Sequence, residues 1–260
     1  MHFYEEPCIS GAKGSGTIFF SHCNLSCRFC QNYEISQQHK GKVISPARLI
    51  EIMLALQSQG AHNINFVSPT PYTNLLSGVL VEVKQQNQLL IPIVWNSNGY
   101  ESVNSLELLW GLVDVFMPDL KYWSDERARE FSGAENYFRH ASNAILEMRR
   151  QVPKDEFEDG LLTKGLIVRH LVLPGQIEDS KMILRWLKDN VGAKTIVSLM
   201  SQYYPAFRAG EHPVLKRRVT AEEYREAYDY FLELGFEEGF VQELSSAEAH
   251  YTPEFKLDGI

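Results

Sequence analysis

The sequence contains few cysteines, only four among 260 residues. Small disulfide-based scaffolds are much richer in cysteine, and disulfides persist mainly in oxidising compartments. Three of the four lie together between Cys23 and Cys30, and Cys8 stands apart. The composition therefore argues against a disulfide framework, and clustered thiols favour a reducing compartment such as the cytoplasm.

Long apolar runs are absent as well. No stretch approaches the roughly 20 apolar residues that a membrane-spanning helix needs. The segment Met1–Glu6 has neither a basic start nor an apolar stretch, so we expect no signal peptide there. Membrane association is therefore not expected.

Positive charge is scarce. Lys and Arg number 25 against 33 Asp and Glu, and the formal net charge is −8. A nucleic-acid partner would require a positive surface for its phosphates. The dense basic run Lys216–Arg218 is short and precedes an acidic helix, which is typical of a solvated corner or a docking point for an acidic protein. The charge balance thus argues against nucleic-acid binding.

The sequence does contain a regular alternation of short apolar strands and amphipathic helices. This pattern predicts a parallel sheet covered by helices, and six strand–helix units fit a partial (β/α)6 barrel better than a closed eight-unit barrel. No Pro-, Gly- or Ser-rich linker divides the chain, so we expect one domain over 1–260, with a core at about 11–204 and a C-terminal helix and short strand within 205–260. The strands are expected at Thr17–Phe20, Asn63–Val67, Ile91–Trp95, Val113–Met117, Gly165–Val172 and Thr195–Met200.

Helices are expected between these strands. The first begins with Ser45 as N-cap and Pro46 at its first position, and it ends at Gly60. Others are expected at about 72–88, 103–112 and 179–190, with helical sequence broken near Gly133, a long helix capped by Thr220, and a last short strand at 239–242. In such folds the chemistry lies at the carboxyl ends of the strands.

The clustered cysteines form the pattern C-x3-C-x2-C at Cys23, Cys27 and Cys30, in the loop that follows the first expected strand. Three thiolates on one short loop can hold three irons of a cubane [4Fe–4S] cluster, although such clusters usually have four cysteine ligands. The fourth iron would then be open to another molecule. The pattern therefore predicts a cluster with one exchangeable position.

Two simpler interpretations stay open. The cysteines could form a structural zinc site with His22 or His39 as fourth ligand, or they could be buried thiols without a metal. Zinc motifs usually come as paired C-x2-C units, and the one remaining cysteine, Cys8, forms no second pair. We expect Cys8 to take no part in a cluster.

Polar residues follow the later strands. Because the carboxyl ends of parallel strands meet at one edge of the sheet, these residues should lie near the cysteine loop. They are Ser68, Pro69 and Thr70 after the second strand, Asn96, Ser97 and Asn98 after the third, Asp119 and Lys121 after the fourth, Arg169 on the fifth and Gln202 after the sixth.

The cysteine spacing, with the aromatic Phe29 directly before Cys30, resembles the signature of the radical S-adenosylmethionine superfamily. From about Gly11 to Tyr204 the motifs are most similar to those of pyruvate formate-lyase activating enzyme and its uncharacterised relatives. The resemblance implies that the open iron chelates the amine and carboxylate of S-adenosylmethionine. One electron then breaks a carbon–sulfur bond and gives methionine and a 5′-deoxyadenosyl radical, while the protein supplies position, potential and exclusion of water.

The resemblance also implies roles for the second and third strand ends. Ser68-Pro69-Thr70-Pro71 stands where many members carry Gly-Gly-Glu-Pro, whose backbone carbonyls receive the substrate amine, and an ordinary proline-shaped turn is the alternative. Asn96-Ser97-Asn98-Gly99 is similar to the Asp-Thr-Asn-Gly segment of the activating enzymes, with Asn96 in place of the acid. These segments are expected to line the S-adenosylmethionine site.

Further roles follow for the later strand ends. Asp119-Leu120-Lys121 matches the family's Asp-Leu-Lys segment, which implies that Lys121 meets the methionine carboxylate and Asp119 helps bind a monovalent cation. A surface ion pair is the alternative. Arg169 is either a partner of the carboxylate or ribose or a structural arginine, and Gln202 is expected to face adenine or the protein substrate.

These motifs favour a radical S-adenosylmethionine oxidoreductase that abstracts hydrogen from a protein or peptide. A glycyl radical enzyme is one candidate substrate, and flavodoxin or ferredoxin is the expected type of electron donor. Two segments depart from the activating enzymes: Lys13-Gly14-Ser15-Gly16 replaces Asp-Gly-Pro-Gly, and Cys30-Gln31-Asn32 replaces Cys-His-Asn. Another peptide or a small molecule therefore stays open as substrate, and a non-catalytic metal-binding protein is the alternative of a different class.

Overall fold

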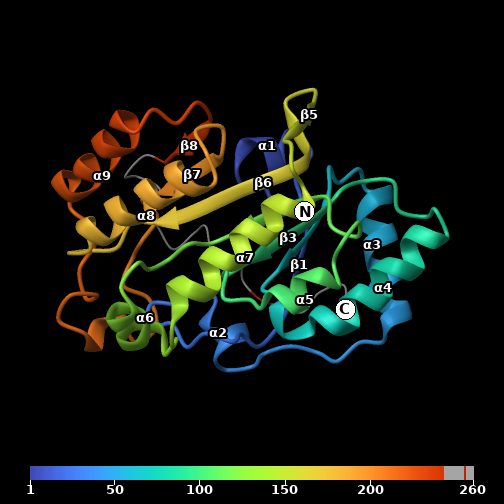
Figure 1. The fold of residues 1–260 in the computed structure, drawn as a ribbon. Coiled ribbons are helices and arrows are strands. Elements are labelled where there is room, and N and C mark those ends of the chain that lie inside the picture. The colour runs from blue at the N-terminus through green and yellow to red at the C-terminus, as the bar shows by residue number, and fades with distance from the viewer. Residues whose placement is uncertain (243–254, 256–260) are drawn as a thin grey trace.

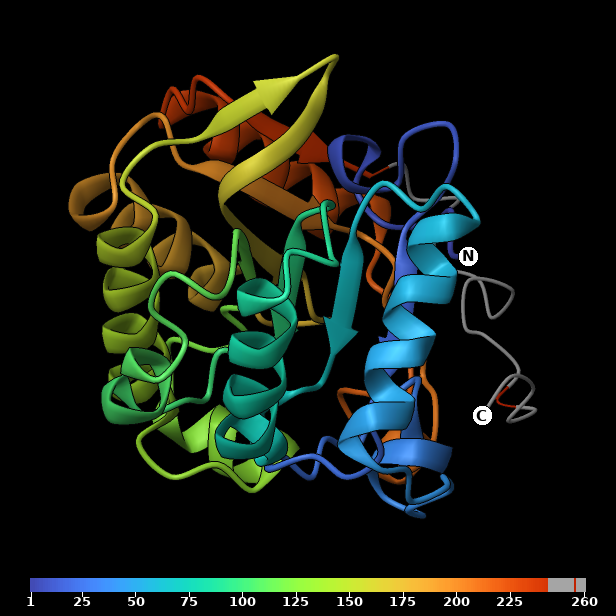
Figure 2. The same ribbon diagram turned by 90° about the vertical axis from the view of Figure 1, so that its right-hand side faces the viewer.

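The computed structural model describes residues 1–242 and Phe255, and its framework is a mainly parallel sheet. The strands are β1 (Gly16–Phe19), β2 (Ile64–Val67), β3 (Ile93–Ser97), β4 (Val115–Pro118), β5 (Glu156–Glu158), β6 (Leu161–Leu171), β7 (Ile196–Met200) and β8 (Gly239–Val241). Seven of them run parallel in the order β1-β2-β3-β4-β6-β7-β8, and β5 pairs antiparallel with β6. Within the described residues β1 and β8 form the two edges of an open sheet, as Figure 1 and Figure 2 show.

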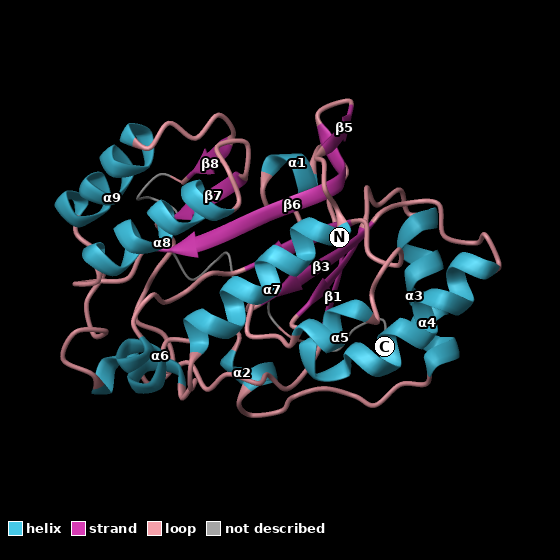
Figure 3. Cartoon of the chain, viewed as in Figure 1, coloured by secondary structure: helices cyan, strands magenta, loops and turns pink. Residues whose placement is uncertain are grey.

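Most of the helices cover the sheet on its outer side, and α1 lies at its inner face (Figure 3). They are α1 (Pro7–Ser10), α2 (Tyr33–Ser36), α3 (Pro46–Ser58), α4 (Thr73–Gln85), α5 (Val103–Glu107), α6 (Asp125–Ser132), α7 (Tyr137–Gln151), α8 (Ile177–Asn190) and α9 (Ala221–Glu233), with short 3-10 turns at Thr70–Tyr72 and Ala209–Glu211. Over the same described range, the structure holds no helix with the length and apolar character of a membrane span. The open, helix-covered parallel sheet confirms the predicted partial barrel.

The predicted helix boundaries have clear physical causes. The Ser45 hydroxyl accepts a hydrogen bond from the Arg48 N–H at 3.1 Å and so caps α3, and Thr220 with Glu223 forms a reciprocal capping box at the start of α9. Gly133 ends α6 in the left-handed conformation, at φ 64°, which separates α6 from α7. The predicted break near Gly133 and the predicted caps are confirmed.

Several elements differ from the sequence-based expectation. The third strand lies at Ile93–Ser97 instead of Ile91–Trp95, because the Asp114 carboxylate accepts a hydrogen bond from the Ile93 N–H at 2.9 Å and the ladder begins there. Residues 108–112 form turns beyond α5 instead of continuing the helix. The short elements α1, α2 and β5 were not expected, since three or four residues give no readable period. Most of the predicted C-terminal stretch beyond β8 lies outside the described residues.

The two faces of the sheet bury different sets of residues. The outer face packs under the helices through large side chains such as Phe66, Trp95 and Phe116. The inner face carries a smaller apolar cluster that joins α1 to the strands. That inner cluster consists of Cys8, Ile9, Val94, Val115, Met117, Leu162, Ile167 and Ile196. The segment around α1 therefore fills part of the barrel interior, which explains why the lone Cys8 is buried.

Gly99 marks the point where the chain after β3 crosses the chain after β4. Its φ is +74°, and a Cβ there would overlap the carbonyl oxygen of Asp119. Gly78 offers a contrast, since it lies within α4 and a Cβ added there would meet no atom within 4 Å. Of the two, only Gly99 therefore requires the absence of a side chain.

Gly99→Ala should lower the free energy of unfolding by about 2 kcal/mol or more, through left-handed strain and the clash with Asp119. Gly78→Ala should raise it by about 0.5–1 kcal/mol, because alanine loses less backbone entropy in a helix. Urea denaturation of both variants and the parent measures these changes. Equal effects at the two positions would contradict the assignment.

Candidate functional site

The cysteine loop leaves the carboxyl end of β1, and each predicted ligand sulfur meets a different element. Asn98 Nδ2, after β3, donates to Cys23 Sγ at 3.3 Å. The Ser132 hydroxyl, at the end of α6, donates to Cys27 Sγ at 3.0 Å, and the Cys30 Sγ lies 3.0 Å from the hydroxyl of Ser36 in α2. Polar donors therefore surround all three sulfurs, as thiolate ligands of a cluster require.

Burial of the cysteine loop disfavours thiolates, and nearby groups offset part of that effect. Burial raises the pKa of the Cys27 thiol to about 12, and the positive charge of Lys121 acts in the opposite direction. Burial likewise raises the pKa of Cys30, while the hydrogen bond from Ser36 favours its thiolate. Iron, which displaces the thiol proton, would be bound in a setting where Lys121 offsets part of the resulting negative charge.

The histidines of the zinc alternative lie beside the loop rather than among its sulfurs. The His22 and His39 rings stack on each other with centroids 4.1 Å apart, and both are exposed. His22 Nδ1 lies 3.1 Å from the Ser21 hydroxyl and 3.3 Å from the Tyr72 hydroxyl. In the described part of the chain, no three His, Cys, Asp or Glu side chains are gathered around a single ion position, and this includes the three cysteines of the loop.

The predicted residues Asp119, Lys121, Arg169 and Asn96 form one buried network. Lys121 Nζ lies 2.5 Å from Asp119 Oδ2, and Arg169 Nε donates to Asp119 Oδ1 at 3.0 Å. Arg169 Nη2 also donates to Asn96 Oδ1 at 2.6 Å. Burial opposes ionisation of Asp119, but the charges of Arg169 and Lys121 outweigh it and lower the pKa of the carboxyl. The alternative of a surface ion pair does not fit, because all three charged side chains are at most 15% exposed.

Asn98 ties the end of β3 to the cysteine loop. Its Nδ2 contacts Cys23 Sγ and also donates to Asn24 Oδ1 at 2.7 Å, while its Oδ1 accepts from the Tyr100 N–H at 2.9 Å. The Tyr137 hydroxyl, from α7, lies 2.9 Å from the Asn98 carbonyl and accepts from the Lys121 N–H at 3.0 Å. Tyr137 was not predicted as a site residue, because nothing in its sequence context relates α7 to these strand ends.

Ser97 and Thr70 direct their hydroxyls at a buried glutamate that was also not predicted. The Glu101 carboxylate accepts from Ser97 at 2.6 Å, from Thr70 at 3.1 Å and from Trp95 Nε1 at 2.9 Å. Burial raises the pKa of Glu101, although these donors favour the charged form. With their hydroxyls engaged, Ser97 and Thr70 would contribute to a cofactor site through the main chain.

Ser68 occupies a strained position directly after β2. Its φ is +58°, and its N–H donates to the Asn96 carbonyl at 2.9 Å. A left-handed conformation costs a non-glycine residue roughly 1–2 kcal/mol. Pro69 follows and begins the 3-10 turn Thr70–Tyr72. The sequence predicted that the prolines would fix the carbonyl directions at this strand end, and the left-handed Ser68 adds a further constraint on the backbone there.

Phe29 and Gln202 lie where the cysteine loop meets the loop after β7. Phe29 is 5% exposed and packs edge-on against Tyr203, with ring centroids 5.6 Å apart. Gln31 Nε2 donates to the Gln202 carbonyl at 3.0 Å, and the Gln202 side chain accepts from Gln242 at 3.2 Å. The structure thus brings the two loops together, and the contacts of Phe29 and Gln202 with a cofactor stay predictions.

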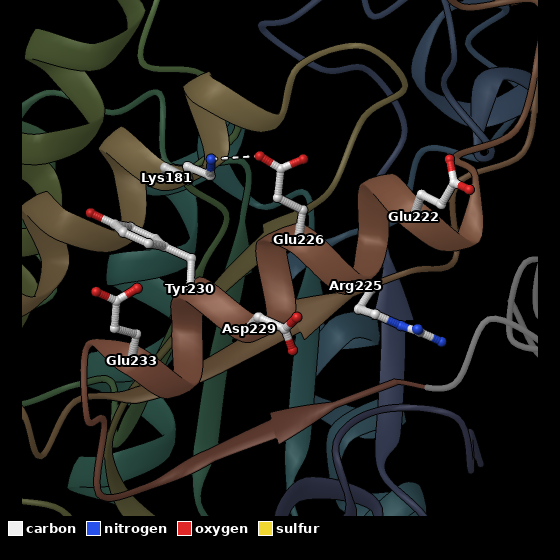
Figure 4. A pocket seen from close by; sticks show the side chains of 7 residues that line it. All are labelled: Lys181, Glu222, Arg225, Glu226, Asp229, Tyr230 and Glu233. Atoms are coloured by element: carbon white, nitrogen blue, oxygen red, sulfur yellow. Dashed lines mark hydrogen bonds and ion pairs between the residues drawn. The ribbon is translucent and has the colours of Figure 1, made fainter.

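A groove lies on the outer helix layer (Figure 4). It runs between α8 and α9, and Lys181 in it pairs with Glu226 at 2.6 Å and with Glu178 at 2.9 Å. Its lining consists of Lys181, Glu222, Arg225, Glu226, Asp229, Tyr230 and Glu233. None of the predicted site residues contributes to it, so the groove is not part of the candidate cofactor site.

Comparison with known sequences identifies the class of protein. The Radical SAM superfamily model matches residues 17–187. The chain therefore belongs to the radical S-adenosylmethionine superfamily, whose members use a [4Fe–4S] cluster and S-adenosylmethionine. An uncharacterized protein of Methanocaldococcus jannaschii, MJ0674, is 34% identical over 237 residues, which cover 88% of this chain and 64% of the relative. The chain thus spans less than two thirds of that relative.

Solved structures agree on the fold. SuiB of Streptococcus suis, bound to its precursor peptide SuiA, superposes with a TM-score of 0.61 at 12% identity, over 90% of this chain and 51% of that one. A domain of pyruvate-formate lyase-activating enzyme from Bacteroides vulgatus gives a TM-score of 0.50 at 11% identity, over 69% of this chain and 98% of that domain. At these identities the likeness concerns the fold, and it confirms the predicted type of partial barrel.

Replacing Cys23, Cys27 or Cys30 with Ala should abolish iron binding, because a cluster with only three protein ligands tolerates no further loss. Cys8→Ala should leave iron binding intact, since Cys8 packs in the inner apolar cluster. Iron and sulfide analysis of anaerobically reconstituted protein measures the effect. Stoichiometric zinc in place of iron would end the cluster assignment.

Lys121→Ala should weaken S-adenosylmethionine binding by more than about 1 kcal/mol, which exceeds the value of an exposed ion pair. Lys84→Ala is the matched control, because Lys84 pairs with Asp114 at 3.2 Å on a more exposed surface. Equilibrium dialysis against the reconstituted variants measures both affinities. Equal affinities in the two variants would place Lys121 outside the site.

Proposed function

We propose that the protein holds a [4Fe–4S] cluster through Cys23, Cys27 and Cys30 and abstracts a hydrogen atom from a protein or peptide substrate. When bound, the cluster and S-adenosylmethionine supply the reductive cleavage that yields a 5′-deoxyadenosyl radical. The observation that carries this proposal is the buried pair of Lys121 and Asp119, 2.5 Å apart, at a strand end that lies next to the β3 end whose Asn98 donates to Cys23 Sγ at 3.3 Å. A cation suited to a carboxylate ligand thus lies beside the proposed cluster loop.

The chain's own residues would bind and orient S-adenosylmethionine. Lys121 would meet its carboxylate, and the carbonyls after β2, whose direction Ser68 fixes, would accept from its amine. Asp119 holds Lys121 in place at 2.5 Å and would bind a monovalent cation with its remaining lone pairs. The other proposed contacts are Phe29, Pro69, Thr70, Asn96, Ser97, Asn98, Arg169 and Gln202.

A protein or peptide substrate is supported by the shape of the site's surroundings. The sheet is open between β1 and β8 within the described residues, and the rings of His2 and Phe255 pack against Phe19 at the β1 edge. The cysteine loop and the loop after β7 form one continuous surface, since the Arg208 N–H donates to the Arg28 carbonyl at 2.9 Å and Tyr33 stacks on Phe207 at 5.0 Å. SuiB, which shares the fold, is known with a bound precursor peptide.

A glycyl radical enzyme is the narrower candidate within this substrate class, by analogy with the activating enzyme whose domain shares the fold. Gln31 stands where those enzymes carry histidine, and here it holds the Gln202 carbonyl. Because Gln31 binds the neighbouring loop, the substrate-facing surface here differs from that of the activating enzymes. Another peptide or a small molecule is therefore the alternative substrate. A flavodoxin or ferredoxin in a reducing cytoplasm would supply the electron.

The test is anaerobic reconstitution with iron and sulfide, followed by reduction with dithionite in the presence of S-adenosylmethionine. The parent should form 5′-deoxyadenosine and methionine, and Cys27→Ala should form neither. A partner captured under the same conditions should then show a carbon-centred radical by electron paramagnetic resonance, and a glycine-centred signal would identify an activating enzyme. Turnover that depends only on a small metabolite would contradict the protein-substrate proposal and leave the cofactor chemistry in place.

A further inference from the structure

The segment 5–10, which includes α1, fills part of the barrel interior at the inner face of the sheet. Asn63 Nδ2 donates to the Ile9 carbonyl at 2.8 Å, and Cys8 and Ile9 are at most 4% exposed. The Glu5 N–H donates to the Ser10 hydroxyl at 3.1 Å, which folds the segment back on itself. The segment is thereby held in place independently of the charged groups that it carries.

The Glu5 carboxylate reaches the network that contains the predicted S-adenosylmethionine residues. Its Oε2 lies 3.4 Å from Arg169 Nη1, and its Oε1 accepts from Asn65 Nδ2 at 3.1 Å. The same guanidinium donates through Nε to Asp119 and through Nη2 to Asn96. Each nitrogen of Arg169 therefore has its own acceptor, and Glu5 supplies one of the three.

The charges in this network do not balance. Arg169 pairs with the Glu5 and Asp119 carboxylates, Glu6 adds a third buried carboxylate on the same segment, and Lys121 is the second cation. Glu6 Oε2 is buried and has no hydrogen-bond partner among the described residues. An excess carboxylate in a buried site favours uptake of a proton. Consistent with this, burial raises the pKa of the Glu5 carboxyl to about 7, although Arg169 acts in the opposite direction.

We propose that Glu5 is a positioning residue for S-adenosylmethionine, acting through Arg169 on Asp119 and Asn96. This inference rests on the proposed function, since it concerns the same site. Glu5 itself lies outside the stretch 17–187 that matches the superfamily model. The segment 5–10 therefore has two roles in this proposal: Glu5 acts on the cofactor site, and Cys8 and Ile9 fill part of the barrel interior.

The physical basis is competition for one guanidinium. With Glu5 ionised, Arg169 is drawn toward the barrel interior and shares its charge between two carboxylates. When Glu5 is neutral, Arg169 is left to Asp119, the carboxylate that also binds Lys121 at 2.5 Å. Asp119 then interacts less with Lys121, so the ammonium of Lys121 changes position relative to the cofactor site. A carboxylate that never touches the cofactor can thus alter its affinity.

Glu5→Gln is the informative variant, because it keeps the side-chain shape and removes the charge. Glu5→Asp keeps the charge on a shorter side chain. It provides a second test of the role of Glu5 if Glu5→Gln does not fold. Cys8→Ala is the matched control, since it perturbs the same buried segment without changing its charge. Equilibrium dialysis of S-adenosylmethionine against anaerobically reconstituted protein, with iron content and melting temperature recorded for each variant, provides the measurement.

At a pH about one unit above the pKa of Glu5, we expect Glu5→Gln to bind S-adenosylmethionine about tenfold more weakly than the parent, equivalent to about 1.4 kcal/mol, with iron content unchanged. Glu5→Asp should fall between the two, and Cys8→Ala should bind as the parent does even if its melting temperature falls. Parent-like affinity in both Glu5 variants, or equal weakening in Cys8→Ala, would overturn the positioning role.

The pH dependence separates positioning from simple structural support. The affinities of the parent and of Glu5→Gln for S-adenosylmethionine should become equal a pH unit below the pKa of Glu5, where both side chains are neutral. They should differ a unit above that pKa, where the Glu5 carboxylate of the parent is charged. Titration of the amine of S-adenosylmethionine is common to both proteins and cancels in their ratio. The groups that face Glu5 are Glu6 on its own segment, Arg169 on β6, Asp119 after β4 and the neutral Asn65 on β2.

A ratio of affinities that does not change with pH would overturn the proposal even if Glu5→Gln binds weakly. Failure of the reconstituted parent to bind S-adenosylmethionine at all would instead refute the proposed function, and the positioning role with it. The two failures are thereby distinguished by the behaviour of the parent protein alone.

Discussion

The candidate site depends on one interaction, the contact of the buried Asp119 carboxylate with both Arg169 and Lys121. Burying charges is costly unless each one has a partner of opposite sign and its hydrogen bonds are satisfied. Asp119 follows β4, Arg169 belongs to β6 and Asn96 lies in β3, so satisfying this network fixes three strand ends relative to one another. Asn98 then connects the same strand ends to Cys23. The position of the cysteine loop thus follows from the requirement to neutralise buried charge.

Much of the fold was predictable because burial and capping leave local signals. Apolar strands such as β4, and caps such as Ser45 and Thr220, are visible in the sequence alone. The shift of the third strand was not visible, because it depends on Asp114, which is distant in sequence from Ile93. The antiparallel β5 likewise depends on pairing with β6, and its three exposed residues carry no pattern of their own.

The sequence predicted those residues of the candidate site that belong to motifs at the ends of the strands. Asp119, Lys121, Arg169 and Asn96 were expected near one another and form one network. Glu5, Glu101 and Tyr137 were not expected, because their contacts join segments that no local pattern relates. The position of Glu101, directly after Asn98-Gly99-Tyr100, was the one available hint of its role. A buried acid near strand ends needs hydrogen-bond donors, and Ser97 supplies one.

The proposed chemistry makes two claims. Three cysteines hold a [4Fe–4S] cluster, and the fourth iron of that cluster binds S-adenosylmethionine. The electron paramagnetic resonance spectrum of the reduced, reconstituted protein, recorded before and after S-adenosylmethionine is added, examines both parts of it at once. We expect the signal of one reduced [4Fe–4S] cluster per chain, with a spectrum that changes when S-adenosylmethionine binds. A cluster signal that S-adenosylmethionine leaves unchanged, or no cluster signal at all, would refute this chemistry.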